Sequence, residues 1–175
     1  MSERGRSGLV PVERSELITT LAEAREYYAA KLVGIRHVEP KGRRIAIVFE
    51  RATTHLYSVE VADLTQVPPS EKVVRYFSGG RAEFRRFAPE RAVLLDLVLP
   101  TLGNYCRSVH GTGPRGRDNR LVFSWPLQDG RALCVALSPW QGTSDKWTCV
   151  SAYPVTAAKL AEVRRHAPAP FPEIG

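Results

Sequence analysis

Three arginines around one proline form the first group of residues in this sequence that could do chemistry. Arg85, Arg86 and Arg91 flank Pro89, which suits the first turn of a helix. The backbone N–H groups at a helix start carry partial positive charge, so arginines placed there favour a bound phosphate. The spacing therefore predicts an anion clamp. The alternative is a solvated helix end in which Glu90 pairs with one of the arginines.

His55, within Thr53-Thr54-His55-Leu56-Tyr57, is the histidine expected on a strand of the sheet. A titratable imidazole beside arginines is what RNA transesterification needs, because a base must take the 2′-hydroxyl proton while cations hold the phosphate. His55 is thus the acid–base candidate, and the alternative is a histidine that serves only the fold.

The strand-like segment 146–154 has polar groups on both of its expected faces. Strict alternation places Lys146 and Thr148 on one face and Ser151 and Tyr153 on the other. A central strand carries polar groups in this way when one face lines a cleft, so the pattern predicts a cleft. A half-exposed edge strand is the alternative.

A basic surface is expected around the middle of the chain. The formal net charge is +7, and residues 75–120 hold nine arginines against four acidic residues, whereas residues 1–50 hold nine basic and seven acidic residues. Such an excess favours a nucleic-acid partner, with a solvated arginine-rich surface as the alternative. The expected contacts are Arg85, Arg120, Lys146 and, in an exposed glycine-rich loop over 111–119, Arg115 and Arg117.

The elements that must position these residues follow from periodicity and turn residues. Helical spacing predicts a helix over 15–33 with Ser15 as its N-cap, a second over 89–104 that Pro100 kinks or ends early, and a third from Thr156 to His166. Alternation predicts a hairpin over 35–49, strands over 55–61 and 72–77, and three meander strands in the ranges 121–125, 133–137 and 147–153.

This order of elements predicts an α+β fold, with an antiparallel meander sheet packed against helices. Long parallel crossovers are not expected, which argues against a doubly wound sheet. The organisation expected is one domain over 13–166, a flexible arm over 1–12 and a proline-rich tail over 167–175.

Several classes of protein are not indicated. No P-loop, GxGxxG, GxSxG, HExxH or EF-hand spacing occurs, and the three cysteines include no CxxC pair, so no metal and no cofactor is expected. Cys134 and Cys149 are interpreted as small buried residues. The longest apolar stretch, 92–102, is shorter than the roughly 20 residues of a membrane helix. With no apolar segment after the basic N-terminus, a cytoplasmic protein is expected.

The order of residues resembles the barnase–EndoU–colicin–RelE superfamily of metal-independent nucleases, in particular its small toxin-like domains associated with phages. The resemblance covers about residues 43–155. It is carried by the His55-Leu-Tyr57 segment, Lys72-Val-Val-Arg-Tyr-Phe77, the segment Arg85-Arg-Phe-Ala-Pro-Glu-Arg91 with the apolar helix after it, and Trp147-Thr-Cys-Val-Ser-Ala-Tyr-Pro154.

The resemblance implies a sheet against helices and cleavage of RNA through a cyclic phosphate without a metal. It makes His55 the acid–base residue, Arg86 and Arg91 the phosphate clamp, and Ser151 with Tyr153 the groups that orient substrate. A glutamate base is missing from the match, since Glu60 and Glu90 are poor substitutes. An inhibitor or antitoxin protein is a further partner that this family suggests.

The sequence is compatible with two functions. The first is an endoribonuclease toxin, with RNA favoured over DNA. The second is a non-catalytic basic module that binds nucleic acid or a protein partner, for which the charge and the aromatic side chains expected on the surface, Trp140 and Trp147, would suffice.

Overall fold

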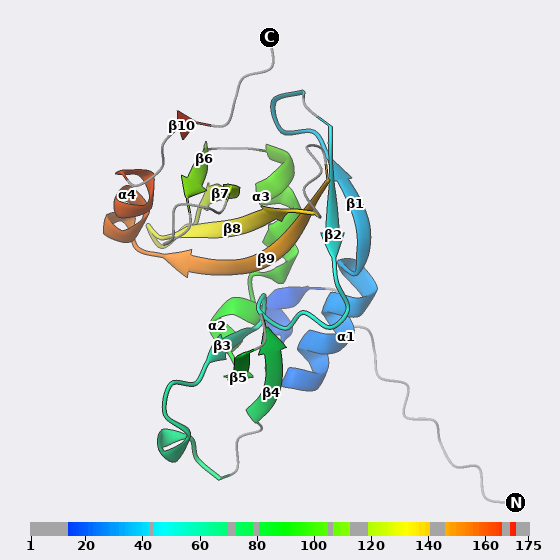
Figure 1. Cartoon of the computed structure of the whole chain (residues 1–175), viewed down its shortest axis with the longest axis vertical. Coiled ribbons are helices and arrows are strands. Elements are labelled where there is room, and N and C mark those ends of the chain that lie inside the picture. Colours follow the sequence, from blue (N-terminus) through cyan, green and yellow to red (C-terminus); the bar gives the residue numbers. More distant parts are fainter. Residues whose placement is uncertain are drawn as a thin grey trace, which may run out of the picture.

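The chain folds into two β-sheets with helices packed around the larger one (Figure 1). The computed structural model describes residues 14–42, 44–69, 73–78, 81–104, 107–112, 119–140, 146–165 and 169–170. The arm expected over 1–12 and, apart from Ala169–Pro170, the tail expected over 167–175 lie outside these residues.

The larger sheet has seven strands in the order β1-β2-β9-β8-β7-β6-β10. Their bounds are Gly34–Val38 (β1), Ile45–Phe49 (β2), Lys146–Val155 (β9), Ala132–Pro139 (β8), Asn119–Pro126 (β7), Arg107–Thr112 (β6) and Ala169–Pro170 (β10). The smaller sheet has the order β3-β5-β4, with Ser58–Glu60 (β3), Arg81–Phe87 (β5) and Val73–Ser78 (β4).

The helices are α1 (Leu21–Lys31), α2 (Pro89–Ala92), α3 (Val98–Asn104) and α4 (Ala157–Arg165), with short 3-10 turns η1 (Ser15–Leu17), η2 (Pro40–Gly42), η3 (Leu64–Gln66) and η4 (Leu95–Leu97). The α+β fold class expected from the sequence is confirmed. So are the 35–49 hairpin, the three meander strands and the last helix, whose first turn is capped by Thr156 Oγ1 accepting from the Lys159 N–H at 3.2 Å.

One strand pairing departs from the antiparallel sheet that the sequence predicted. β2 runs parallel to β9, with Ala46, Ile47 and Val48 opposite Lys146, Trp147 and Thr148. The connection between them comprises the small sheet, α2, α3 and the meander strands β6 to β8. A pairing across about a hundred residues leaves no local signal, because hydrophobic alternation does not identify a strand's neighbours.

A β-bulge in β9 changes which residues share a face. Leu137 is opposite Cys149 and Ala136 is opposite Ser151, so Val150 is the extra residue. The partners of Thr148, Ser151 and Tyr153 are Ser138, Ala136 and Cys134, which are alternate residues of β8. The expectation that Lys146 and Thr148 face away from Ser151 and Tyr153 is therefore wrong. All four side chains belong to one face.

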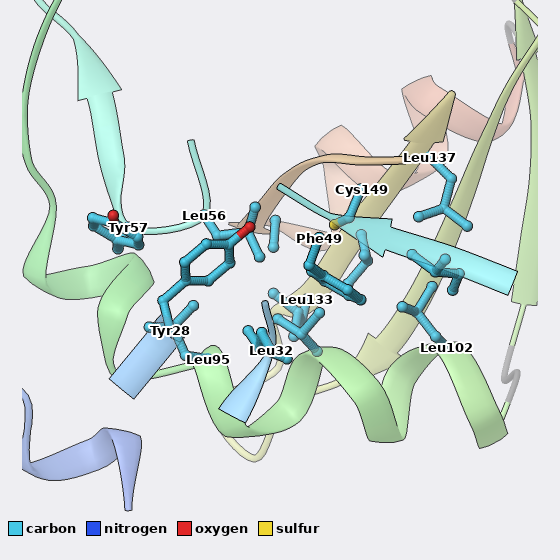
Figure 2. Packing of buried hydrophobic residues seen from close by; sticks show 14 of the residues in the cluster. Tyr28, Leu32, Phe49, Leu56, Tyr57, Leu95, Leu102, Leu133, Leu137 and Cys149 are labelled. Carbon is cyan, nitrogen blue, oxygen red and sulfur yellow. The ribbon is translucent and has the colours of Figure 1, made fainter. Parts of the chain in front are cut away.

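The core lies on the opposite face of the sheet, which we call the inner face. Residues of α1, η4 and α3, including Tyr28, Leu95 and Leu102, pack against strand residues such as Phe49 and Leu133 (Figure 2). A smaller cluster on the outer face joins Val122, Cys134 and Val155 to Leu160 of α4. Each face of the sheet thus has its own apolar contact, and α4 lies at one end of the outer face (Figure 1).

The first helix begins later than the sequence indicated. Thr20, and not Ser15, is the N-cap of α1: its Oγ1 accepts from the Glu23 N–H at 3.2 Å. The Glu23 carboxylate in turn accepts from the Thr20 hydroxyl at 3.0 Å, which makes a capping pair three residues apart. Ser15 lies instead in η1, where it is fully buried.

Ser15 attaches this N-terminal segment to the chain after α2. Its hydroxyl donates to the Val93 carbonyl at 2.9 Å and to the Asp96 carboxylate, and accepts from the Asp96 N–H at 3.0 Å. Ser15→Ala should lower the free energy of unfolding by about 1–3 kcal/mol, because it leaves the part-buried Val93 carbonyl and Asp96 N–H without their partner. Urea denaturation measures the loss. Thr20→Ala is the comparison, since a lost N-cap costs about 1 kcal/mol. A decrease in the free energy of unfolding of less than about 0.5 kcal/mol, which is within the error of the extrapolation, would contradict this role of Ser15.

The long helix expected over 89–104 is broken into α2, η4 and α3. An uninterrupted helix would hold Pro100 in its interior, where proline removes a hydrogen bond and clashes with the preceding turn. Starting α3 at Val98 places Pro100 in a first turn, where no donor is needed. The break also brings α2 against β9 and β3, which is the region of the candidate site.

Candidate functional site

His55 lies in a turn and not on a strand, contrary to the expectation of a strand over 55–61. The chain turns after β2 through hydrogen bonds from the Thr53 N–H to the Glu50 carbonyl and from the Tyr57 N–H to the Thr54 carbonyl, each at 3.1 Å. The Ser58 hydroxyl closes the turn by donating to the Thr54 carbonyl at 2.7 Å. β3 begins only at Ser58, so this compact turn positions the imidazole.

Arg85 and Arg86 lie on β5, so the expected helix start holds only Arg91. Within β5, successive side chains point to opposite faces. Arg85 is buried, with 6% of its surface exposed, whereas Arg86 is exposed on the other face. The predicted helix does begin at Pro89, and Arg91 lies in its short first element α2. The three arginines therefore do not form the one clamp that the sequence predicted.

Glu83 is the site residue that the sequence reasoning missed. Its Oε2 lies 3.6 Å from Nε2 of His55 and 3.5 Å from Nη1 of Arg85. The side chains of His55 and Glu83 are 22% and 23% exposed, so both are accessible from solvent. The signal was present: alternation along 81–87 places Glu83 and Arg85 on one face, once that segment is recognised as a strand.

Arg85 is a fixed cation behind this pair. Its Nε donates to Ser58 Oγ and its Nη2 to the Ser58 carbonyl, both at 2.8 Å. On the side that faces His55, Nη1 of Arg85 donates to Oε2 of Glu83 at 3.5 Å. A buried guanidinium needs such partners, and together they hold β5 against the turn that carries His55.

Arg91 joins the His55 turn to β9. Its Nη1 donates to the carbonyls of His55 and Ser58, both at 3.1 Å, and its guanidinium lies over the ring of Tyr153 at 5.8 Å from the centroid. Within the described part of the chain, Nε and Nη2 of Arg91 take part in no hydrogen bond. Two nitrogen atoms of this partly buried cation therefore have N–H groups that no described residue accepts.

We call the group His55, Ser58, Glu83, Arg85, Arg91 and Tyr153 the His55 cluster. It is contributed by a turn, β3, β5, α2 and β9. Its charges shift the protonation of its members. Burial lowers the pKa of His55, and the positive charges of Arg85 and Arg91 lower it further. Glu83 opposes them and raises this pKa. Burial and the charge of Arg85 also lower the pKa of Arg91.

The lowered pKa of His55 predicts a pH-dependent stability. Between that pKa and the ordinary value of 6.5, the unfolded chain binds a proton that the folded chain does not. The free energy of unfolding contributed by His55 is then complete above pH 6.5 and is lost as the pH falls through this window. His55→Gln should flatten that part of the curve in urea unfolding from about pH 7 to about pH 5. His37→Gln, which removes an exposed imidazole, is the control, and parallel curves for wild type and His55→Gln would contradict the prediction.

The other predicted site residues lie at various distances from the cluster. Ser151 shares the outer face with Tyr153, and Lys146 lies at the far end of β9. Arg120 is in β7, and Arg115 and Arg117 lie outside the described residues. The structure thus brings together His55, Arg85, Arg91 and Tyr153, and leaves Arg86 on another face.

Two further expectations concern aromatic and sulfur side chains. Trp147 was expected on the surface, but it is 6% exposed because it lies on the inner face beside Ile47. Trp140 is partly exposed. Cys134 and Cys149 are both buried, and burial raises the pKa of Cys149 to about 12, so it would not be a thiolate nucleophile near neutral pH.

The described residues contain no group of three or more His, Cys, Asp or Glu side chains arranged to hold a metal ion. None of their helices is long and apolar enough to cross a bilayer. The chemistry that the His55 cluster does offer is proton transfer at an imidazole paired with a carboxylate, next to cations that can attract an anion. No protein family, curated protein or solved structure matches this chain, so the cluster is interpreted on its own geometry.

Proposed function

We propose that this protein is a metal-independent ribonuclease whose active site is the His55 cluster. The observation that carries the proposal is the His55–Glu83 pair, with Nε2 and Oε2 at 3.6 Å, next to the Arg91 guanidinium, whose Nε and Nη2 make no hydrogen bond to a described residue. Glu83 is not the glutamate base that the resemblance to metal-independent nucleases lacked, because in this proposal His55 is the base and the carboxylate orients it. A base, a carboxylate that orients it and a phosphate ligand are the groups that attack by a 2′-hydroxyl requires.

In the proposed reaction His55 is the general base. Its lowered pKa favours the neutral imidazole near pH 7, and Glu83, whose Oε2 lies 3.6 Å from Nε2, would orient the ring so that the imidazole takes the proton of the 2′-hydroxyl. The 2′-oxygen forms a bond to phosphorus as the bond to the 5′-oxygen breaks. The products are a 2′,3′-cyclic phosphate and a 5′-hydroxyl end.

The remaining groups act on the phosphate and the leaving oxygen. Nε and Nη2 of Arg91 would bind the non-bridging oxygens, where negative charge increases in the transition state. Tyr153, whose ring lies 5.8 Å from the Arg91 guanidinium, would give its phenolic proton to the 5′-oxygen. Solvent then returns the proton from His55 to Tyr153. Arg85 stays fixed by Ser58 and holds the site together.

RNA is preferred over DNA in this proposal because the nucleophile is part of the substrate. The decisive experiment incubates purified protein with a labelled RNA and its DNA counterpart in the presence of EDTA, from about pH 5 to about pH 8. Cleavage of RNA only, with cyclic phosphate ends, supports the proposal. Intact RNA at every pH, or equal cleavage of DNA, overturns it.

A second function, a non-catalytic nucleic-acid-binding module, is favoured by a separate observation. The net charge of +7 acts at long range and needs no acid–base pair. Affinity for RNA that falls steeply with salt, without any turnover, would identify this function. A ribonuclease in the cytoplasm would also require restraint, so under the first function we expect an acidic inhibitor protein that covers Arg91.

A further inference from the structure

The outer face of the large sheet presents two rows of side chains across its strands. The register places His37, Ala46, Lys146 and Trp140 in one row, because His37 is opposite Ala46, Ala46 is opposite Lys146, and the Trp140 N–H donates to the Lys146 carbonyl at 2.8 Å. In the next row are Ile35, Val48 and Thr148. His37 and Ile35 are exposed, the latter at 54%, and the others in the two rows are partly exposed.

This surface begins and ends at a cation beside an aromatic ring. At the start of β9, Nζ of Lys146 lies 5.6 Å from the ring centroid of Trp140. Near its end, the guanidinium of Arg91 lies 5.8 Å from that of Tyr153. Lys146 and Tyr153 belong to the same face because of the bulge at Val150. They are seven positions apart along β9, which corresponds to about 20 Å.

Small or short side chains lie between the two pairs. Thr148 and Ser151 of β9 have Ser138 and Ala136 as their partners on β8. The positions between the two rings therefore carry short side chains, two of them hydroxyls, beside Val150, which packs against the apolar cluster of the outer face. This surface ends at Arg91, whose Nη1 donates a hydrogen bond to the carbonyl of His55.

We propose that this surface, from Trp140 and Lys146 to Tyr153 and Arg91, binds a single-stranded stretch of RNA and leads it to the His55 cluster. The inference rests on the proposed function for its substrate. Bases of an unpaired strand stack on aromatic rings while cations contact the phosphates, which is the combination found at both ends of the path. A duplex would keep its bases stacked inside, so the rings favour single strands. The positive charge of the chain matches a polyanion.

The test measures binding to a 2′-O-methyl oligouridine, which cannot be cleaved through its 2′-oxygen, by fluorescence anisotropy. Trp140→Ala should weaken binding about tenfold or more, and Trp140→Phe should restore most of it. Lys146→Ala should reduce the slope of log affinity against log salt by about 0.7, the value for one phosphate contact on a single strand. Lys31→Ala, an exposed lysine on α1 at the inner face, is the matched control and should leave affinity and slope unchanged. Circular dichroism verifies that each variant is folded.

The outcomes separate this path from the proposed catalysis. Binding that depends on Trp140 and Lys146 in a protein that cleaves no RNA would support the path and refute the ribonuclease. Cleavage with unchanged oligonucleotide affinity in Trp140→Ala and Lys146→Ala would overturn the path and leave the ribonuclease standing. Absence of binding by the wild-type chain also overturns the path. So does equal affinity for polyglutamate, which would indicate an acidic protein as the partner.

Discussion

Replacing His55 by alanine is expected to slow RNA cleavage by about 100- to 10,000-fold, the range that a general base contributes. The loss should fall on kcat, because the imidazole is not proposed to hold the substrate. Affinity for the uncleavable oligonucleotide should stay the same. Single-turnover cleavage of a labelled RNA measures the first quantity and anisotropy the second.

Glu83→Gln gives this prediction a sharper form. The amide can accept a hydrogen bond from Nε2 of His55 but carries no charge, and Glu83 raises the pKa of His55 in the folded protein. The acidic limb of the rate profile should therefore move to lower pH in Glu83→Gln, with a smaller loss of rate than in His55→Ala. A His55→Ala variant that cleaves RNA at the wild-type rate would remove His55 from the mechanism.

Replacing Arg91 by lysine is expected to lower kcat/KM by about 100- to 1,000-fold, as for other donors that meet developing charge. Lysine keeps the charge but lacks the planar arrangement of donors that lets one guanidinium bond two carbonyls and still offer Nε and Nη2 to a phosphate. Arg86→Lys should have a much smaller effect, because Arg86 lies on the opposite face of β5. Because both substitutions keep the positive charge, comparing Arg91→Lys with Arg86→Lys tests the arrangement of the donors of Arg91 and not the net charge.

Arg91 also supports the turn that carries His55, so the contribution of Arg91 to stability must be measured separately from its effect on the rate. The hydrogen bonds to the carbonyls of His55 and Ser58 predict a lower Tm for Arg91→Ala. Added guanidinium ion at low concentration should restore part of the rate of Arg91→Ala if the cation acts on the phosphate. Arg131→Ala, which removes an exposed partner of Asp129, should respond to neither test. Equal losses in Arg91→Lys and Arg86→Lys would refute the assignment.

The local patterns were sufficient for much of the fold. Alternation identified β1, β2 and the meander strands, and the apolar spacing identified α1, because each buries one side of a regular element. The element ends differed from the prediction: Thr20 and not Ser15 caps α1, and the interruption expected at Pro100 lies before it, because α3 begins at Val98 and continues through Pro100 to Asn104. Those errors are local, and they come from competing caps and from proline geometry.

The site depended on contacts that no local pattern contains. His55, Arg91 and Tyr153 could be selected from the sequence as groups suited to phosphate chemistry, but Arg86 could not be separated from Arg85 until β5 was recognised as a strand. Glu83 could be recognised as a site residue only in the folded structure, where its Oε2 lies 3.6 Å from Nε2 of His55.

By itself, the sequence determined the α+β class, the extended and helical segments and the residue types able to hold a phosphate, because these follow from side-chain period and charge over a few residues. Tertiary structure alone decided that β2 pairs with β9, that a bulge places Lys146 and Tyr153 on one face, and that Glu83 meets His55. Such contacts join distant segments, and their energy comes from burial and packing of the whole chain and not from any one stretch of it.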